Sequence, residues 1–296
     1  MSIPVGFIGL GALGAPMAAN LLAKGFPLTV HNRHRERELS LAAAGARRAA
    51  TPAEAARGAG LLALCLSDDT AVAEVLLGWG GDTANAALAG LESGAMVVDF
   101  STIAPASSRT MASALAEHGV AYLDAPVTGG TEGARAGSLS VLVGGGAADL
   151  ERARPVLEAV GRTITCLGPV GAGQEAKAVN QVLVAGCYAA VAEAMALGQR
   201  LGLPMEEVRQ ALVGGAAGSW ALEHRGSSML RGEFPLGFRL RLHRKDLAIA
   251  LEAAAASDLG LPVARQVAAM EDDLIAAGHG DEDVSALARW FGAESR

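Results

Sequence analysis

"VGFIGLGALGAPMAANLLAKG", residues 5–25, is the stretch that decides the fold of this chain. Its first four residues form an apolar run that predicts a buried strand, and residues 15–24 predict a helix that ends at Gly25. The turn between them has the spacing Gly9-x-Gly11-x-x-Gly14. Ordinary turns in a chain with 38 glycines also produce this spacing. The strand before it and the helix after it favour a dinucleotide-binding turn.

Each glycine of such a turn has its own role. The first permits the sharp bend, the second lets the backbone approach a pyrophosphate, and the third lets the helix pack closely against the strand. The N-terminus of the helix presents backbone N–H groups to the phosphates. We therefore predict a cofactor loop made of Gly9, Leu10, Gly11, Ala12, Leu13 and Gly14.

The composition is that of a globular protein. Of the 296 residues, 51% are hydrophobic and 19% are charged, and only 4% are aromatic, so the core is built from Ala, Leu and Val. The net charge of −7 leaves no broad basic surface for nucleic acid. Three cysteines, Cys65, Cys166 and Cys187, lie in apolar stretches and are predicted to be reduced core residues. The histidines have no ligand spacing, so no metal site is expected.

The sequence has no recognisable secretory signal and no apolar run of membrane-spanning length. Pro4 and the glycine loop interrupt any apolar signal segment, and no basic residues precede it. The longest apolar run, residues 182–192, is short for a bilayer and has polar neighbours on both sides. We expect a soluble cytoplasmic protein that does not bind membranes.

The order of elements predicts two domains. Apolar runs that predict strands alternate with helical segments up to residue 168, which is typical of a doubly wound α/β Rossmann-type sheet. The strands are expected at 27–31, 61–66, 95–100, 121–123, 139–143 and 163–167, and the helices at 36–45, 51–57, 104–117 and 148–160.

From Gly171 onward the period is helical almost everywhere. Helices are expected at 174–201, 205–213, 218–230, 244–259 and 263–277. We predict an NAD(P)-binding domain over 1–168 and an all-helical substrate and oligomerisation domain over 169–296. Residues 168–173 are the expected hinge, and a substrate cleft is expected between the domains.

Further motifs resemble one family, the β-hydroxyacid dehydrogenases, which includes 3-hydroxyisobutyrate dehydrogenase, tartronate semialdehyde reductase and the glyoxylate/succinic semialdehyde reductases. Besides the glycine loop, the resemblance rests on "DFSTIAP" (99–105), "DAPVTGGTEGARAGSLSVLVGG" (124–145), "GAGQEAKAVNQ" (171–181) and "HRKDLAIAL" (243–251). It implies an oxidoreductase that passes hydride between a nicotinamide and the aldehyde carbon of a small acidic semialdehyde. A homo-oligomer is expected.

The resemblance also implies roles for single residues. Lys177 is the implied catalytic residue, because an ammonium beside a carbonyl stabilises alkoxide charge and donates a proton. From the sequence alone it is equally well a surface lysine. The substrate is assigned to Thr128, Gly129, Gly130, Asn180 and Gln181, and further cofactor contacts to Leu66, Ser67, Thr102 and Lys245. Family members more often carry serine where this chain has Thr128.

The choice of cofactor follows from "HNRHR", residues 31–35. NAD-selective sites place Asp or Glu at this point, about 20 residues after the glycines, where it repels a 2′-phosphate. Here Asn32 holds the position, and Arg33 beside it can pair with a phosphate. We therefore predict a preference for NADP(H), with NAD(H) as the alternative. Solvated loop residues that ignore the cofactor are the competing interpretation.

Three other functions were weighed. Imine reductases share the two-domain plan but usually lack the lysine, and 6-phosphogluconate dehydrogenases have a longer helical domain. A non-catalytic cofactor-binding protein on the same fold is the hypothesis from another class, and the presence of Lys177 argues against it.

Overall fold

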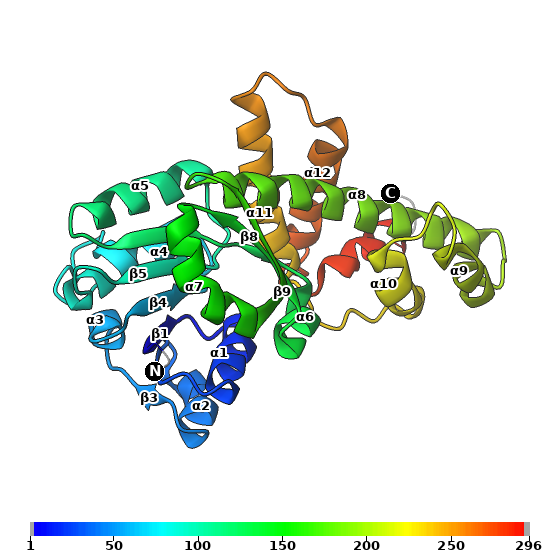
Figure 1. The fold of residues 1–296 in the computed structure, drawn as a ribbon. Helices are drawn as coiled ribbons and strands as arrows, with labels where there is room; N and C mark the ends of the chain where they lie inside the picture. The colour runs from blue at the N-terminus through cyan, green and yellow to red at the C-terminus, as the bar shows by residue number, and fades with distance from the viewer. Residues whose placement is uncertain (1–2, 293–296) are drawn as a thin grey trace. The chain divides into compact units, whose positions relative to one another are not determined.

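The computed structural model describes residues 3–292 and forms two compact units, Met1–Lys177 and Ala178–Arg296 (Figure 1). The division falls inside the long helix α8 (Ala172–Arg200), beyond the expected hinge at 168–173. Each unit has its own hydrophobic core.

The first unit is built on one mostly parallel sheet. Within residues 3–292 the sheet has nine strands in the order β3-β2-β1-β4-β5-β6-β8-β7, with β9 paired to β8. The first six strands along this path are parallel, and β8 runs antiparallel to β6 and β7. This order is that of the dinucleotide-binding fold and confirms the predicted fold class. The strands are β1 (Val5–Ile8), β2 (Leu28–His31), β3 (Arg47–Arg48), β4 (Leu61–Leu64), β5 (Met96–Asp99), β6 (Ala121–Asp124), β7 (Val127–Thr128), β8 (Leu139–Gly144) and β9 (Gly161–Gly168).

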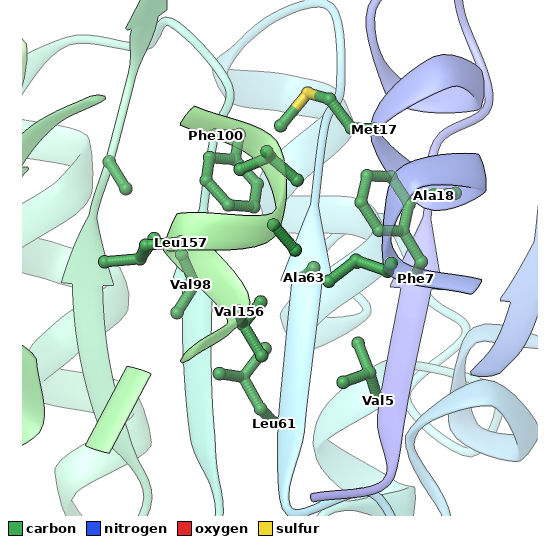
Figure 2. Packing of buried hydrophobic residues seen from close by; sticks show 14 of the residues in the cluster. Val5, Phe7, Met17, Ala18, Leu61, Ala63, Val98, Phe100, Val156 and Leu157 are labelled. Atoms are coloured by element: carbon green, nitrogen blue, oxygen red, sulfur yellow. The ribbon is translucent and has the colours of Figure 1, made fainter. Parts of the chain in front are cut away.

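Helices cover both faces of this sheet. On one face α1 and α7 pack against β1, β4 and β5, and Figure 2 shows Met17 and Val156 meeting the strand residues Phe7 and Leu61 in this layer. On the other face α3, α4 and α5 enclose a second cluster. The helices are α1 (Gly14–Ala23), α2 (Leu39–Ala43), α3 (Pro52–Ala56), α4 (Asp69–Leu77), α5 (Pro105–Ala116), α6 (Gly130–Ala136) and α7 (Ala147–Val160), with short 3₁₀ helices η1 (Arg35–Glu38) and η2 (Ala87–Gly90).

Some elements differ from the sequence prediction. The helix expected at 36–45 is divided into η1 and α2, and α4 was not predicted. Its signals are nevertheless in the sequence. Asp68 caps its start by accepting a hydrogen bond from the backbone N–H of Ala71 at 2.8 Å, and Gly78 ends it in the left-handed conformation.

The second unit is helical throughout its described residues, as predicted. It contains most of α8, then α9 (Met205–Val213), α10 (Trp220–Arg231), α11 (Leu240–Ala255), α12 (Pro262–Ala276), η3 (Val284–Leu287) and α13 (Ala288–Gly292). Leu240, Leu247 and Leu287 are fully buried in its core. The helices therefore enclose a core that does not depend on the sheet.

Two expectations about apolar segments need correction. The cysteines are free thiols, but Cys166 on β9 and Cys187 on α8 are exposed in the single chain, and only Cys65 is partly buried. An apolar stretch does not reveal which side of an element faces outward. Among the described residues α8 is also long and apolar enough to cross a membrane, a test that core helices of soluble proteins pass as well; 39% of its most apolar window is buried.

Candidate active site

The glycine loop follows β1 and has one open position. Gly9 has φ +100°, and a Cβ there would overlap the carbonyl oxygen of Cys65. A Cβ at Gly14 would overlap the carbonyl oxygen of Gly9, at the start of α1. At Gly11, by contrast, nothing lies within 4 Å of an added Cβ. Two glycines are needed by the fold itself, while the third leaves space for a ligand to approach the backbone.

The carboxyl ends of four parallel strands lie at the same edge of the sheet. Ile8, Leu64, Asp99 and Asp124 are aligned across β1, β4, β5 and β6. The segments that follow these strands contain the predicted cofactor contacts, namely the glycine loop, Leu66 and Ser67, and Thr102. Two of these segments are joined, because the backbone N–H of Leu66 donates to Oγ of Ser101 at 2.8 Å. Ligands of open α/β sheets bind at this edge.

Asn32, at the end of β2, is buried and hydrogen-bonded within the unit. Its Oδ1 accepts from the backbone N–H of Leu10 at 2.8 Å, and its Nδ2 donates to the carbonyl of His34 at 2.9 Å. These bonds join the end of β2 to the glycine loop, beside the predicted cofactor contact. Arg33 beside it is exposed.

Glu38 organises the basic segment that follows Asn32. Its carboxylate is fully buried, accepts from the backbone N–H of Asn32 at 3.0 Å, and pairs with Arg35 at 2.8 Å and Arg48 at 2.7 Å. Burial by itself raises the pKa of Glu38, but the hydrogen bonds from Arg48, Asn32 and Arg35 outweigh it and hold the pKa below its usual value. The sequence analysis did not identify this residue.

The predicted carboxylate-binding turn joins β7 to α6. Thr128 is half-buried at the end of β7, and Gly129 and Gly130 both have positive φ, +128° and +63°. L-residues with side chains rarely adopt these angles, so the two glycines are required for the turn. α6 begins at Gly130. The turn therefore offers a hydroxyl and the backbone of two glycines that carry no side chain, which suits an anion, although the Glu132 carboxylate lies 3.0 Å from the position of a Cβ on Gly130.

Asp124 fixes the start of α8. Its fully buried carboxylate accepts from the backbone N–H of Gly171 at 2.7 Å and of Gln174 at 2.9 Å. Burial raises the pKa of Asp124 in spite of these backbone donors. A carboxylate at this position satisfies N–H groups that the helix leaves unpaired and complements its dipole.

The neighbouring segment is fixed by a second buried carboxylate. Asp99 accepts from the backbone N–H of Ser101 at 2.9 Å and from the hydroxyl of Tyr122 at 3.0 Å. Burial raises the pKa of Asp99 to about 6, and these hydrogen bonds limit the rise. The "DFST" segment is thus fixed by hydrogen bonds at Asp99, the last residue of β5, including one from Tyr122 on β6.

Lys177 lies on the second turn of α8 and is only 6% exposed. It is therefore not the surface lysine of the competing interpretation. It belongs to the first unit, with Asp124 and the segment 99–103. A buried ammonium on a helix whose start is fixed by a carboxylate has a restricted position, as proton donation requires.

In the second unit the structure brings together the predicted residues Asn180, Gln181 and Lys245. Asn180 Nδ2 donates to Gln181 Oε1 at 2.8 Å, and Gln181 Nε2 donates to Asp246 Oδ2 at 2.6 Å. Lys245 Nζ pairs with Asp246 Oδ1 at 2.7 Å. Gln181 is 1% exposed and Asp246 is also buried, so these amides and charges form one network.

The residues that the sequence analysis missed are mostly those that support others. Asp99, Ser101, Asp124 and Gln174 all lie inside motifs that were quoted, but only their burial and partners reveal their roles. Within residues 3–292 there is no group of three or more His, Cys, Asp and Glu side chains suited to hold a metal.

Comparisons with known proteins agree with this geometry. Residues 4–168 match the family model of the NAD binding domain of 6-phosphogluconate dehydrogenase, and residues 171–291 match that of the NAD-binding domain of NADP-dependent 3-hydroxyisobutyrate dehydrogenase. The chain is 40% identical to 2-hydroxy-3-oxopropionate reductase of Escherichia coli (strain K12), over 96% of this chain and 95% of that protein. It is 39% identical to NAD-dependent L-serine dehydrogenase of Pseudomonas aeruginosa, over 97% of each.

Solved structures of similar proteins cover nearly the whole chain. Psf3 in complex with NADP⁺ and 2-OPP has a TM-score of 0.89 and 30% identity, over 98% of this chain and 100% of that one. An imine reductase from Myxococcus stipitatus in complex with NADP⁺ has a TM-score of 0.64 and 21% identity, over 97% and 99% of the two chains. That likeness shows the fold alone.

Proposed function

The chain belongs to the β-hydroxyacid dehydrogenase family, and we propose that it interconverts a small semialdehyde acid and its hydroxy acid. We propose NADP(H) as its preferred cofactor. Its relatives are dehydrogenases or reductases of this class, which supports a hydroxyacid dehydrogenase and not an imine reductase. The observation that carries the proposal is the buried Lys177, on a helix fixed at its start by Asp124.

The residues present fit a dinucleotide. The open position at Gly11 lets a pyrophosphate approach the backbone, and the start of α1 supplies N–H groups to it. A bound nicotinamide supplies or accepts the hydride. Leu66, Ser67 and Thr102, on segments at the same edge of the sheet, are the proposed contacts for the rest of the cofactor.

Each of the other groups has a step that suits its chemistry. The Thr128 hydroxyl and the backbone of Gly129 and Gly130 hold the substrate carboxylate. The Lys177 ammonium stabilises the negative charge that develops on the carbonyl oxygen and donates a proton to it. In the oxidation direction the same amine accepts the hydroxyl proton.

The test of Lys177 separates chemistry from binding. We expect Lys177→Ala to lower kcat about 100-fold or more while the Kd for NADPH, measured by fluorescence, stays within about threefold. Wild type and variant are assayed with tartronate, succinic and methylmalonate semialdehydes and with glyoxylate. A variant that keeps half of the wild-type kcat contradicts the assignment. Tight cofactor binding by wild type without turnover of any substrate would favour a non-catalytic protein.

The proposed preference for NADP(H) rests on the exposed Arg33 and on the absence of an acid at position 32. Because Asn32 is hydrogen-bonded to Leu10 and His34, we assign the 2′-phosphate to Arg33. Arg33→Ala is expected to lower kcat/KM for NADPH about 10- to 100-fold and to leave NADH nearly unchanged. A wild-type enzyme that favours NADH, or a variant that loses both cofactors equally, would refute this part of the proposal.

A further inference from the structure

The carboxamide of Gln174 bridges two segments of the first unit. Its Oε1 accepts from the backbone N–H of Ile103 at 3.2 Å, and its Nε2 donates to the carbonyl of Ser101 at 2.8 Å. These two residues flank Thr102, so one amide group fixes the backbone on both sides of the proposed nicotinamide contact. Gln174 is 1% exposed, and its partners lie more than 70 positions earlier in the chain.

Gln174 also lies on the helix that carries Lys177. The two residues are three positions apart on α8, so their side chains leave neighbouring parts of the same helix face. The backbone N–H of Gln174 donates to Asp124, which fixes the first turn of the helix. Gln174 thus connects the segment assigned to the nicotinamide with the helix assigned to proton donation.

We propose that Gln174 is a positioning residue, which sets the place of Thr102 relative to Lys177 and so the alignment of hydride and proton transfer. This inference rests on the proposed roles of Thr102 and Lys177. Its physical basis is that reacting groups must be held within a few tenths of an ångström, and a displacement of about 1 Å can lower the rate about 100-fold. An amide suits the task because it donates and accepts at once, which neither a carboxylate nor an apolar side chain can do.

The main variant is Gln174→Met, which keeps the length of the side chain and removes both hydrogen bonds. We expect kcat to fall about 10- to 100-fold, with the Kd for NADPH within about threefold of wild type. The primary isotope effect measured with 4-deuterated NADPH should increase, because hydride transfer becomes slower than the other steps. Backbone hydrogen exchange in a peptide that covers 101–104 should become faster, because the Ile103 N–H loses its acceptor.

A neighbouring residue supplies the matched control. Glu175 is the next residue on α8 and pairs with Arg109 on α5 at 3.2 Å, but both side chains are more than half exposed. Exposed pairs of this kind contribute little. Glu175→Gln should therefore leave kcat, the isotope effect and the exchange of 101–104 unchanged, although it removes the charge from an ion pair of the same helical turn.

Gln174→Glu keeps the proposal testable if Gln174→Met does not fold. A carboxylate still accepts from Ile103 but cannot donate to Ser101, whereas the protonated acid regains a donor. Its kcat relative to wild type should therefore rise as the pH is lowered. A folded Gln174→Met with kcat within twofold of wild type, or with unchanged exchange of 101–104, would overturn the proposal. So would a Gln174→Glu whose kcat relative to wild type does not rise as the pH is lowered. Failure of the Lys177→Ala test would instead remove the assigned role of Lys177, since the exchange result does not depend on it.

Discussion

The glycine loop permits a matched pair of substitutions. Gly14→Ala should lower the stability of the fold, whereas Gly11→Ala should weaken cofactor binding. A Cβ at Gly14 overlaps the carbonyl oxygen of Gly9 and also lies 3.2 Å from the ring of Phe7, so the start of α1 must move away from β1. Overpacking of this kind costs about 1–3 kcal/mol. Alanine would otherwise favour a helix by about 1 kcal/mol over glycine, so a loss of stability isolates the clash.

Gly11→Ala should behave in the opposite way. Its added methyl group meets nothing within 4 Å, and Gly11 is not among the residues with positive φ, so the folded chain accepts it. The methyl group does occupy the space through which a pyrophosphate approaches the backbone. We expect the melting temperature to stay within about 2 °C of wild type, and the Kd for NADPH to rise about 10- to 100-fold, which is about 1.4–2.8 kcal/mol.

Thermal unfolding without cofactor and fluorescence titration with NADPH measure the two effects separately. Gly14→Ala should melt several degrees lower, since each kcal/mol shifts the midpoint by about 2–4 °C in a chain of this size. If Gly11→Ala binds NADPH as tightly as wild type, the pyrophosphate does not pass over Gly11. If Gly14→Ala melts like wild type, the close approach of α1 to β1 is not a constraint of the fold.

Three further predictions concern buried carboxylates. Glu38→Ala should lower the free energy of unfolding in urea by about 1.5–3 kcal/mol at neutral pH. The difference from wild type should shrink as the pH falls, because a carboxylate with a lowered pKa stabilises the folded state only while it is ionised. Asp99 has the opposite sign. Its pKa is raised from 3.8 to about 6, so wild type should lose about 2 kcal/mol relative to Asp99→Asn between pH 4 and pH 6, and the absence of this trend would refute the raised pKa. In the second unit Asp283 is fully buried, pairs with Arg225 at 3.4 Å and accepts from the backbone N–H of Gly237 at 2.8 Å. Asp283→Ala should therefore lower the free energy of unfolding in urea, followed by circular dichroism, by about 3–5 kcal/mol. A loss below about 1 kcal/mol would contradict the pairing.

The sequence predicted the fold well where apolar periodicity is strong. Strands β1, β2 and β8 and the long helix α8 are found within a few residues of their expected bounds. β1 is buried on both faces, which gives this parallel strand a continuous apolar run. Short elements were missed for a physical reason. β3 is two arginines at an edge of the sheet, so it has no apolar pattern at all, and its pairing with β2 depends on the chain folding back.

The site divides in the same way. The proposed roles of Lys177 and the glycine loop come from local motifs in the sequence, whereas the hydrogen bonds of Glu38 and Gln174 depend on partners from distant segments. Asn32 is the instructive intermediate. Its place about 20 residues after the glycines can be read from the sequence, but only the structure reveals that its amide is hydrogen-bonded to Leu10 and His34. A sequence can locate a polar residue near a site without revealing whether it faces the ligand or the protein.

The bond between Asn32 and Leu10 has a consequence for anyone who wishes to redesign cofactor choice. The usual route to NAD is an acid at position 32, and Asp would keep the acceptor for the Leu10 N–H. Its second oxygen, however, would face the carbonyl of His34, which now accepts from the Asn32 amide. Repulsion between the two oxygens would disturb the loop that holds the pyrophosphate. Position 32 thus serves the fold, and the exposed Arg33, to which we assign the 2′-phosphate, is the proposed position for changing selectivity without disturbing these hydrogen bonds.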